Sequence, residues 1–307
     1  MPHRVFIDGG HGTTGLEIHE RLHGRTDFEQ ILLDDAARKD DDARRDALAA
    51  ADFAILCLPD DEARKAVALA ADTGTRIIDA STAHRIDPDW VFGFAEMEAG
   101  QRERIASAKR VSNPGCYALT FITLVRPLVR AGLVAADARI SVNATSGYSG
   151  GGKAMIAEFE SGAARTAFRN YALPLAHKHL PEMRERTGLS HAPLFSPSVA
   201  NAYRGMLVEI PLWSVDGGAA RDTLTSAYDG SRLISVLSDT ETEAMGVLPL
   251  ERCAGTDRLD IIVFENSANG QIRLVGAIDN LGKGAAGSAV QNLNLMAGAN
   301  ELAGLRL

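Results

Sequence analysis

A glycine-rich stretch near the N-terminus limits the fold of this chain more than any other feature. Residues 9–15 have the sequence Gly-Gly-His-Gly-Thr-Thr-Gly, which follows an apolar run at 4–8 and precedes a helical pattern at 16–22. At such a junction one glycine makes a tight turn, one lets the backbone approach a pyrophosphate, and one lets the helix pack on the strand. The helix N-terminus adds N–H groups and a positive dipole end. The stretch therefore predicts a nucleotide-binding loop, with a plain turn as the alternative.

The first third of the chain alternates strand-like and helix-like segments. Residues 28–33, 53–58 and 76–79 have strand patterns, and residues 60–71 have a helical one. The run at 53–58 is apolar throughout, as expected for a parallel strand buried on both faces. Strands that alternate with helices form βαβ units, so we expect a Rossmann-type α/β domain with a parallel sheet. The Asp-rich residues 34–46 are expected to form a solvated loop and a helix start.

After Cys116 the pattern changes to longer β-branched or alternating segments. They lie at 139–144, 202–211, 259–264 and 271–278, and they predict a mixed sheet with helices beside it. Residues 285–307 are predicted to form a helix with Val290, Leu293 and Met296 on one face. A chain of 307 residues is long enough for about two domains.

Composition and charge exclude several classes of protein. Hydrophobic residues make up 46% of the chain and charged residues 23%, the balance of an ordinary globular protein. No apolar run approaches the roughly 20 residues that span a bilayer, and the N-terminus lacks the apolar region of a signal peptide, so we expect a cytoplasmic protein without a membrane partner. The net charge of -8 argues against a nucleic-acid partner. Anionic ligands would need local cations or N–H groups.

Cys116 is the best candidate for a nucleophile. Residues 112–117 have the sequence Ser-Asn-Pro-Gly-Cys-Tyr and precede a helical pattern at 118–126, so the thiol is expected at a helix N-terminus, where the dipole favours the thiolate. Cys57 lies inside an apolar strand and Cys253 has no evident partner, so both are expected to be inert. The three cysteines form no C-x-x-C pair, which argues against a disulfide framework or a zinc ribbon.

The segment His177-Lys178-His179 offers a base for this thiol. In an extended segment both histidines would face the same side, but no third ligand stands at useful spacing, so no metal site is expected. The residues alone do not decide which histidine is the base. The other histidines are expected on the surface or in loops: His3, His11, His19, His23, His84 and His191.

Two further loops and one acidic turn are relevant to the binding of anionic ligands. Residues 146–153 combine hydroxyls, N–H groups and a lysine, as a phosphate or carboxylate cradle requires, with a flexible hairpin as the alternative. Residues 279–284 precede the last helix and suit a turn with a helix start. Asp34 and Asp35 would favour the ribose 2′-OH of NAD, whereas Arg38 and the adjoining Lys39 would favour the 2′-phosphate of NADP. The sequence leaves that choice open.

Five segments, in order along the chain, resemble a known family. Residues 114–117, 177–182 and 278–287 resemble three signatures of the N-acetyl-gamma-glutamyl-phosphate reductases. Residues 79–85 and 146–153 are similar to the shorter, second type of that family. With the glycine loop, the resemblance runs from Gly9 to Asn294. The loop departs from the longer type at 10–11 and 13–14, which affects detailed cofactor contacts.

The resemblance implies the fold of the glyceraldehyde-phosphate and aspartate-semialdehyde dehydrogenases. Residues 1–115 plus 285–307 would form the NADP-binding Rossmann domain, and residues 116–284 an α+β catalytic domain. It also implies NADPH as the donor, a homo-oligomer (dimer or tetramer), and the reduction of N-acetyl-L-glutamyl 5-phosphate to the 5-semialdehyde through a cysteine thioester, in L-arginine biosynthesis. These statements are expectations for the structure to meet.

The resemblance, together with the loop chemistry, assigns residues to three roles. The expected catalytic residues are Cys116 and His177. The expected cofactor-binding residues are Gly9, Gly12, Thr13, Thr14, Gly15, Arg38, Ser81, Asn280 and Lys283. The expected substrate-binding residues are Arg85, Asn113, Ser146, Ser149, Gly150, Lys153, His179 and Glu182.

Two other functions remain open at this point. An aspartate-semialdehyde dehydrogenase, or a reductase of the one-carbon-longer aminoadipyl phosphate, would share the thiol, the base and the cofactor, and only pocket size would separate them. A non-catalytic nucleotide-sensing protein would keep the Rossmann domain. Cys116 together with His177 counts against this second alternative, because a sensor needs neither.

Overall fold

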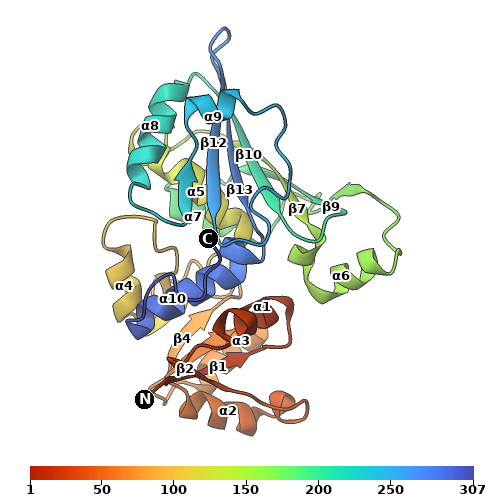
Figure 1. The fold of residues 1–307 in the computed structure, drawn as a ribbon, viewed down its shortest axis with the longest axis vertical. Helices are drawn as coiled ribbons and strands as arrows, with labels where there is room; N and C mark the ends of the chain where they lie inside the picture. The colour runs from red at the N-terminus through yellow and green to blue at the C-terminus, as the bar shows by residue number, and fades with distance from the viewer. The chain divides into compact units, whose positions relative to one another are not determined.

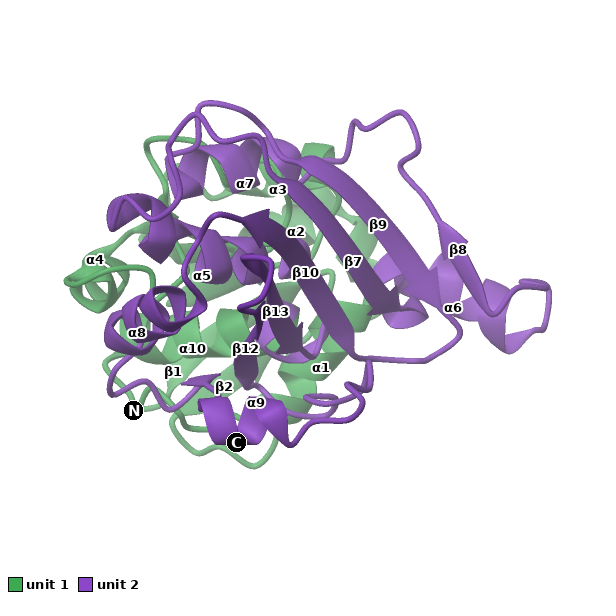
Figure 2. Cartoon of the chain, turned by 90° about the horizontal axis from the view of Figure 1, so that it is seen from above, with its two compact units in different colours: residues 1–115, 285–305 green, residues 116–284, 306–307 purple.

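The computed structural model describes residues 1–307 and divides them into two compact units (Figure 2). Unit 1 comprises residues 1–115 and 285–305, and unit 2 comprises residues 116–284 and 306–307. No helix in either unit is long and apolar enough to cross a membrane.

Unit 1 is built on a parallel six-stranded sheet in the order β2-β1-β3-β4-β6-β5 (Figure 1). The strands are β1 (His3–Asp8), β2 (Phe28–Ile31), β3 (Phe53–Leu56), β4 (Arg76–Asp79), β5 (Val91–Phe92) and β6 (Arg110–Ser112). The helices are α1 (Thr13–Leu22), α2 (Asp41–Ala50), α3 (Asp60–Leu69), α4 (Gln101–Ser107) and α10 (Gly287–Ala297). Because β2 and β3 lie on opposite sides of β1, the chain reverses direction across the sheet there. Open α/β sheets bind ligands at such a point.

The core of unit 1 explains why its central strand is apolar throughout. Phe53 and Ile55 of β3 belong to a cluster that includes residues of α1 and α10. Ala54 and Leu56 belong to a second cluster, with residues of α2 and α3. Helices cover both faces, so both sets of alternating side chains are buried, as a Rossmann-type sheet requires.

Several elements of unit 1 are shorter than the sequence pattern indicates. β2 and β3 each end two residues before the predicted limit. The last helix does not extend to residue 307, because α10 ends at Ala297 and Gly298 adopts a left-handed conformation with φ 67°. The left-handed region at this position ends helices and favours glycine.

Unit 2 contains a mixed seven-stranded sheet in the order β11-β12-β13-β10-β7-β9-β8. Its strands are β7 (Ser141–Gly147), β8 (Phe168–Asn170), β9 (Leu194–Ala200), β10 (Met206–Trp213), β11 (Ile234–Val236), β12 (Leu259–Asn266) and β13 (Gln271–Ile278). Its helices are α5 (Cys116–Arg130), α6 (Gly152–Glu160), α7 (Leu180–Thr187), α8 (Gly217–Ala227) and α9 (Asp239–Glu243). The expected mixed sheet is therefore present.

Helix α5 packs closely on this sheet. A Cβ at Gly276 of β13 would lie 2.3 Å from the Thr120 side chain of α5, so the helix and the strand approach there only because residue 276 is glycine. The sequence analysis missed β9, whose Pro197 weakens a strand prediction. In the sheet Pro197 stands opposite Ala144 in the parallel pairing of β9 with β7.

Candidate active site

The glycine loop connects β1 to α1 with the geometry that a nucleotide-binding turn needs. Gly9 has φ 80°, and a Cβ there would lie 2.3 Å from the carbonyl oxygen of Cys57. A Cβ at Gly15 would lie 2.6 Å from the Cα of Gly10. Gly12 is the residue before α1, and the Oγ1 atom of Thr13 is buried without a hydrogen-bond partner. A buried hydroxyl without a partner at a helix N-terminus fits the phosphate oxygens of a bound dinucleotide.

A cavity of about 390 Å³ lies at the carboxyl ends of β1 and β2. Gly9 and Gly10 line it, together with four basic side chains: Arg38, Lys39, Arg44 and Lys65. Asp34 and Asp35 do not line it. The Asp34 carboxylate accepts hydrogen bonds from the N–H groups of residues 36 and 37, and Asp35 pairs with Arg38 at 2.9 Å. Three other acids, Asp8, Asp41 and Glu62, do line the cavity, where they pair with Arg44 and Lys65. Arg38 and Lys39 are therefore the cations of the wall that fit a 2′-phosphate.

Asp8 and Arg44 form a buried ion pair at the edge of this cavity. The two side chains are 2.9 Å apart, and Glu62 lies 3.2 Å from the same guanidinium. Burial raises the pKa of Asp8 above its ordinary value, although the hydrogen bond and the charge of Arg44 act in the opposite direction. The pair ties the end of β1 to α2.

Three predicted ligand-binding residues of unit 1 make contacts within the chain. The Ser81 hydroxyl donates to Asp79 at 2.7 Å. Arg85 donates to the carbonyls of Asn113 and Ala80, both at 3.0 Å. The Asn113 amide donates to the carbonyl of Ala285 at 3.0 Å. These contacts hold the two turns in place.

His84 lies in a turn, which agrees with the expected loop position, but it is not a surface residue. It is buried, its Nδ1 lies 2.7 Å from Asp79, and its ring stacks on Trp90 with 4.2 Å between centroids. The apolar face of the indole and the buried carboxylate draw the imidazole inward, a contact that the local sequence did not indicate.

Cys116 is the first residue of α5 and is partly exposed. A Cβ at Gly284 would lie 2.8 Å from the Cβ of Cys116, so the turn after β13 reaches the thiol residue only with glycine there. Burial is the largest effect on the other two thiols, and it raises the pKa of Cys57 and of Cys253 to about 12. Only Cys116 therefore combines exposure with a helix N-terminus.

A pocket of about 210 Å³ contains this thiol. Helix α5 contributes Cys116 and Tyr117, the end of β7 and the following turn contribute Ser146, Gly147, Gly150 and Gly151, and the loop before α7 contributes Tyr171, His177 and Lys178. Met155 and Val199 complete the wall. The structure thus brings together four of the predicted site residues: Cys116, Ser146, Gly150 and His177.

His177 is held by its neighbours in the loop and by aromatic rings. Its Nδ1 accepts the backbone N–H of His179 at 3.2 Å, and the two imidazole rings are 4.7 Å apart at 80°. Tyr117 and Phe195 meet the His177 ring edge-on at 5.9 and 5.1 Å. Residues 178 and 179 form a turn before α7, so this segment is not extended.

Tyr171 is a pocket residue that the sequence analysis missed. Its hydroxyl donates to the hydroxyl of Tyr117 at 3.1 Å, and burial raises its pKa to about 12. The phenol therefore stays protonated beside Cys116 at any working pH. Tyr171 belongs to no recognisable motif, so only the folded loop reveals it.

The loop at 146–153 is less open to anions than its sequence suggests. The N–H groups of residues 147, 148 and 149 donate to backbone carbonyls of residues 202–205, at distances between 2.8 and 3.0 Å. Lys153 is exposed on α6 and does not line the pocket. The expectation of exposed N–H groups is wrong for these three residues, because the turn is paired with the β9–β10 connection.

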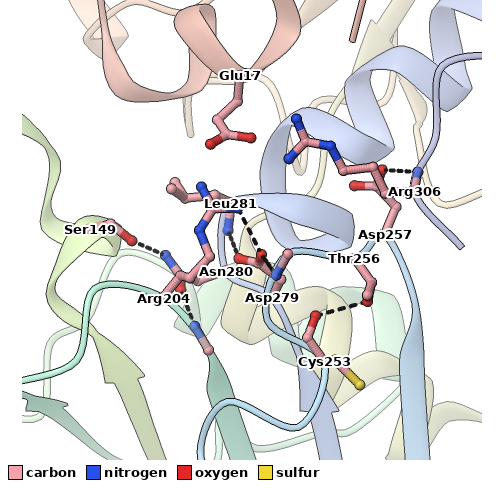
Figure 3. A network of polar contacts seen from close by, with 12 residues as sticks. Glu17, Ser149, Arg204, Cys253, Thr256, Asp257, Asp279, Asn280, Leu281 and Arg306 are labelled. Atoms are coloured by element: carbon pink, nitrogen blue, oxygen red, sulfur yellow. Dashed lines mark hydrogen bonds and ion pairs between the residues drawn. The ribbon is translucent and has the colours of Figure 1, made fainter. Parts of the chain in front are cut away.

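Asn280 and Asp279 belong to a polar network that fixes the turn after β13 (Figure 3). The Asn280 amide donates to Ser149 Oγ at 2.9 Å, and its Oδ1 accepts the N–H of Gly205 at 3.0 Å. Arg204 donates to Asp279 at 3.2 Å. Asn280 and Ser149 thus join three loops of unit 2. The other candidates of this unit, His179, Glu182 and Lys283, are buried and lie outside the pocket lining.

Comparison with known families gives the class of the protein. Residues 4–108 match the family model described as "Semialdehyde dehydrogenase, NAD binding domain", and residues 116–280 match "Semialdehyde dehydrogenase, dimerisation domain". Aspartate semialdehyde dehydrogenase II from Vibrio cholerae aligns with a TM-score of 0.74 and 17% identity, covering 96% of this chain and 98% of that one. The enzyme from Francisella tularensis aligns with a TM-score of 0.73 and 13% identity, covering 96% and 100%. The fold and the two domains are therefore those of the semialdehyde dehydrogenase class.

Relatives at higher identity narrow the class. A protein named N-acetyl-gamma-glutamyl-phosphate reductase from Brucella anthropi is 49% identical, over 97% of this chain and 99% of its own length. The protein of the same name from Brucella ovis is 48% identical over 97% and 100%. The chain belongs to the N-acetyl-gamma-glutamyl-phosphate reductase family. The predicted resemblance and the predicted fold class are confirmed.

Proposed function

We propose that this chain catalyses the NADPH-dependent reduction of N-acetyl-L-glutamyl 5-phosphate to N-acetyl-L-glutamate 5-semialdehyde and phosphate, as a step of L-arginine biosynthesis. The observation that carries the proposal is a partly exposed thiol, Cys116, at the start of α5 in one pocket with His177. The full-length relationship to reductases of that name favours this acyl phosphate over aspartyl or aminoadipyl phosphate.

Cys116 and His177 divide the chemistry between them. His177 takes the thiol proton, and the thiolate sulfur forms a bond with the acyl carbon. The bond between that carbon and the phosphate oxygen breaks, phosphate leaves with the electron pair, and a thioester remains on Cys116. The N–H groups at the start of α5 are candidates to stabilise the oxyanion that develops. When the aldehyde leaves, His177 returns the proton to the sulfur.

Bound NADPH supplies the hydride that reduces the thioester carbonyl. Gly9, Gly12, Thr13, Thr14 and Gly15 would hold its pyrophosphate, and the buried Thr13 hydroxyl without a partner supports this fit. Arg38 and the adjoining Lys39, which line the cavity, would bind the 2′-phosphate. Ser81, Asn280 and Lys283 stay proposed cofactor contacts.

The remaining assignments are part of the same proposal. Residues 1–115 plus 285–307 would bind the cofactor, and residues 116–284 would bind the substrate and a second copy of the chain, which would work in the cytoplasm. Of the proposed substrate contacts, Ser146 and Gly150 line the pocket. The others, which lie outside the lining, are Arg85, Asn113, Ser149, Lys153, His179 and Glu182.

A phosphate-dependent NADP⁺ reduction assay tests the proposal. The semialdehydes of N-acetylglutamate, aspartate and N-acetylaminoadipate are compared as substrates, each with NADP⁺ and with NAD⁺. We expect the highest kcat/KM for N-acetylglutamate semialdehyde with NADP⁺. A preference for either other aldehyde would move the chain to another reductase of this fold, and equal kcat/KM values for the two cofactors would contradict the assignment of Arg38. Absence of turnover with all three would favour the nucleotide-sensing alternative.

A further inference from the structure

The thiol pocket has one cation and no acid in its wall. Lys178 is the only lysine or arginine that lines it, and no aspartate or glutamate does. In the nucleotide cavity, by contrast, cations have acidic partners: Lys65 pairs with Asp41 at 2.7 Å, and Arg44 pairs with Asp8 at 2.9 Å. Since the chain carries a net charge of -8, an anionic substrate needs such a local positive charge.

Residues 146–153, which the sequence suggested as an anion-binding loop, offer the pocket fewer N–H groups and less positive charge than expected. The N–H groups of residues 147–149 are engaged by carbonyls of residues 202–205, and Lys153 stands exposed on α6 outside the pocket. Lys178, although also exposed, is therefore the one lysine or arginine that the pocket wall offers to an anion.

We propose that Lys178 binds the phosphate group of the acyl phosphate, and inorganic phosphate in the reverse reaction. This inference rests on the proposed function. The substrate has two anionic groups, a phosphate joined through oxygen to the reacting carbon and a carboxylate three further carbons away. Lys178 follows His177 directly in the chain, and His177 is assigned to proton transfer at the reacting carbon. The neighbouring cation is placed to meet the phosphate, and an ammonium group is a compact charge of the kind that binds phosphate.

The experiment compares wild type, Lys178→Met and Lys178→Arg, with Lys109→Met as the control, because Lys109 is an exposed lysine outside the pocket. In the phosphate-dependent oxidation of N-acetylglutamate semialdehyde, the KM for inorganic phosphate should rise about 10- to 100-fold in Lys178→Met, the range for loss of a hydrogen bond to a charged group. The KM for the semialdehyde should change less than about twofold. Lys178→Arg should retain most of the phosphate affinity, and Lys109→Met should behave as wild type.

A second measurement needs neither cofactor nor turnover. Inorganic phosphate should protect Cys116 of the wild type from iodoacetamide, and Lys178→Met should need about 10- to 100-fold more phosphate for the same protection. An unchanged phosphate KM with unchanged protection would overturn the inference. A rise in the semialdehyde KM alone would assign Lys178 to the carboxylate and overturn it too. If the wild type does not turn over this semialdehyde, the proposed function fails, while the protection experiment still reports on Lys178.

Discussion

At the scale of single residues, the three thiols occupy three different environments. Cys253 is buried and Cys57 is partly exposed, and loss of solvation is the main reason that the pKa of each thiol is raised to about 12. Cys116 stands partly exposed at the start of a 15-residue helix. A thiolate is the reactive form of cysteine, so chemistry at neutral pH is open to only one of the three.

Cys116→Ala should abolish turnover and leave NADPH binding intact, because the thiol lies in unit 2 and the nucleotide loop in unit 1. Cys57→Ala is the control and should retain activity. Turnover assays and fluorescence titration with NADPH measure both variants. An active Cys116→Ala protein would remove the nucleophile assignment.

His177→Asn should lower the rate by about 10² to 10⁴, the usual effect of losing a positioned acid/base. His179→Asn should cost clearly less, because His179 contacts the Nδ1 of His177 through its backbone N–H, which the substitution keeps. Steady-state kinetics give the comparison.

A second measurement separates the two histidines independently. Iodoacetamide alkylation of Cys116, followed against pH, should have its midpoint raised in His177→Asn and unchanged in His179→Asn. The opposite pattern would exchange their roles.

At the scale of elements, the packing of α1 against the turn after β1 depends on one missing side chain. A Cβ at Gly15 would lie 2.6 Å from the Cα of Gly10, which is backbone and cannot rotate away. The helix must shift, and with it the N–H groups that face the nucleotide.

Gly15→Ala should therefore raise the Kd for NADPH by roughly 5- to 150-fold, the equivalent of about 1–3 kcal/mol of overpacking. Gly74→Ala is the control, because no atom lies within 4 Å of the added carbon. Titration of both variants with NADPH tests this. Equal affinities would show that α1 tolerates the methyl group.

Arg44→Met should destabilise the connection of β1 to α2 by roughly 3–5 kcal/mol near neutral pH, because Asp8 is left as a buried charge. The folded-state pKa of Asp8 is already raised by burial and would rise further without Arg44. A raised carboxyl pKa means that the folded state binds the proton more tightly than the unfolded state does. The free energy of unfolding is therefore greatest below the pKa that Asp8 has in the unfolded chain, and it falls as the pH rises through the pKa that Asp8 has in the folded chain. The loss of unfolding free energy in Arg44→Met, measured by urea unfolding, should therefore be smaller at about pH 5 than at about pH 7.5. Arg45→Met, on the exposed side of α2, should show little change at either pH.

At the scale of the whole molecule, residues 116–280 match a dimerisation domain. The chain has a mass of 32.7 kDa, and we expect its main species in sedimentation velocity to have two or four times that mass. The match to a dimerisation domain is the reason for this expectation, because most soluble oligomers are closed assemblies of identical subunits. A monomer at micromolar concentration would contradict this expectation.

The sequence by itself determined the class of the fold and the identity of the chemical groups. The glycine loop, the apolar run of β3 and Cys116 before a helical pattern are local signals, since each depends on neighbours within a few residues along the chain. The same holds for His177 and His179, whose positions in sequence already placed them near each other.

Only the tertiary structure decided which polar groups are available to a ligand. Asp34 is engaged by its own turn, the N–H groups of residues 147–149 are engaged by the β9–β10 connection, and His84 is drawn inside by Trp90 and Asp79. Tyr171, which lies outside every motif, acquires a place in the pocket because the loop before α7 forms part of the wall beside Cys116. Hydrogen bonds and burial between residues far apart in sequence settle these outcomes, and such contacts leave no periodic or local trace in the amino-acid order.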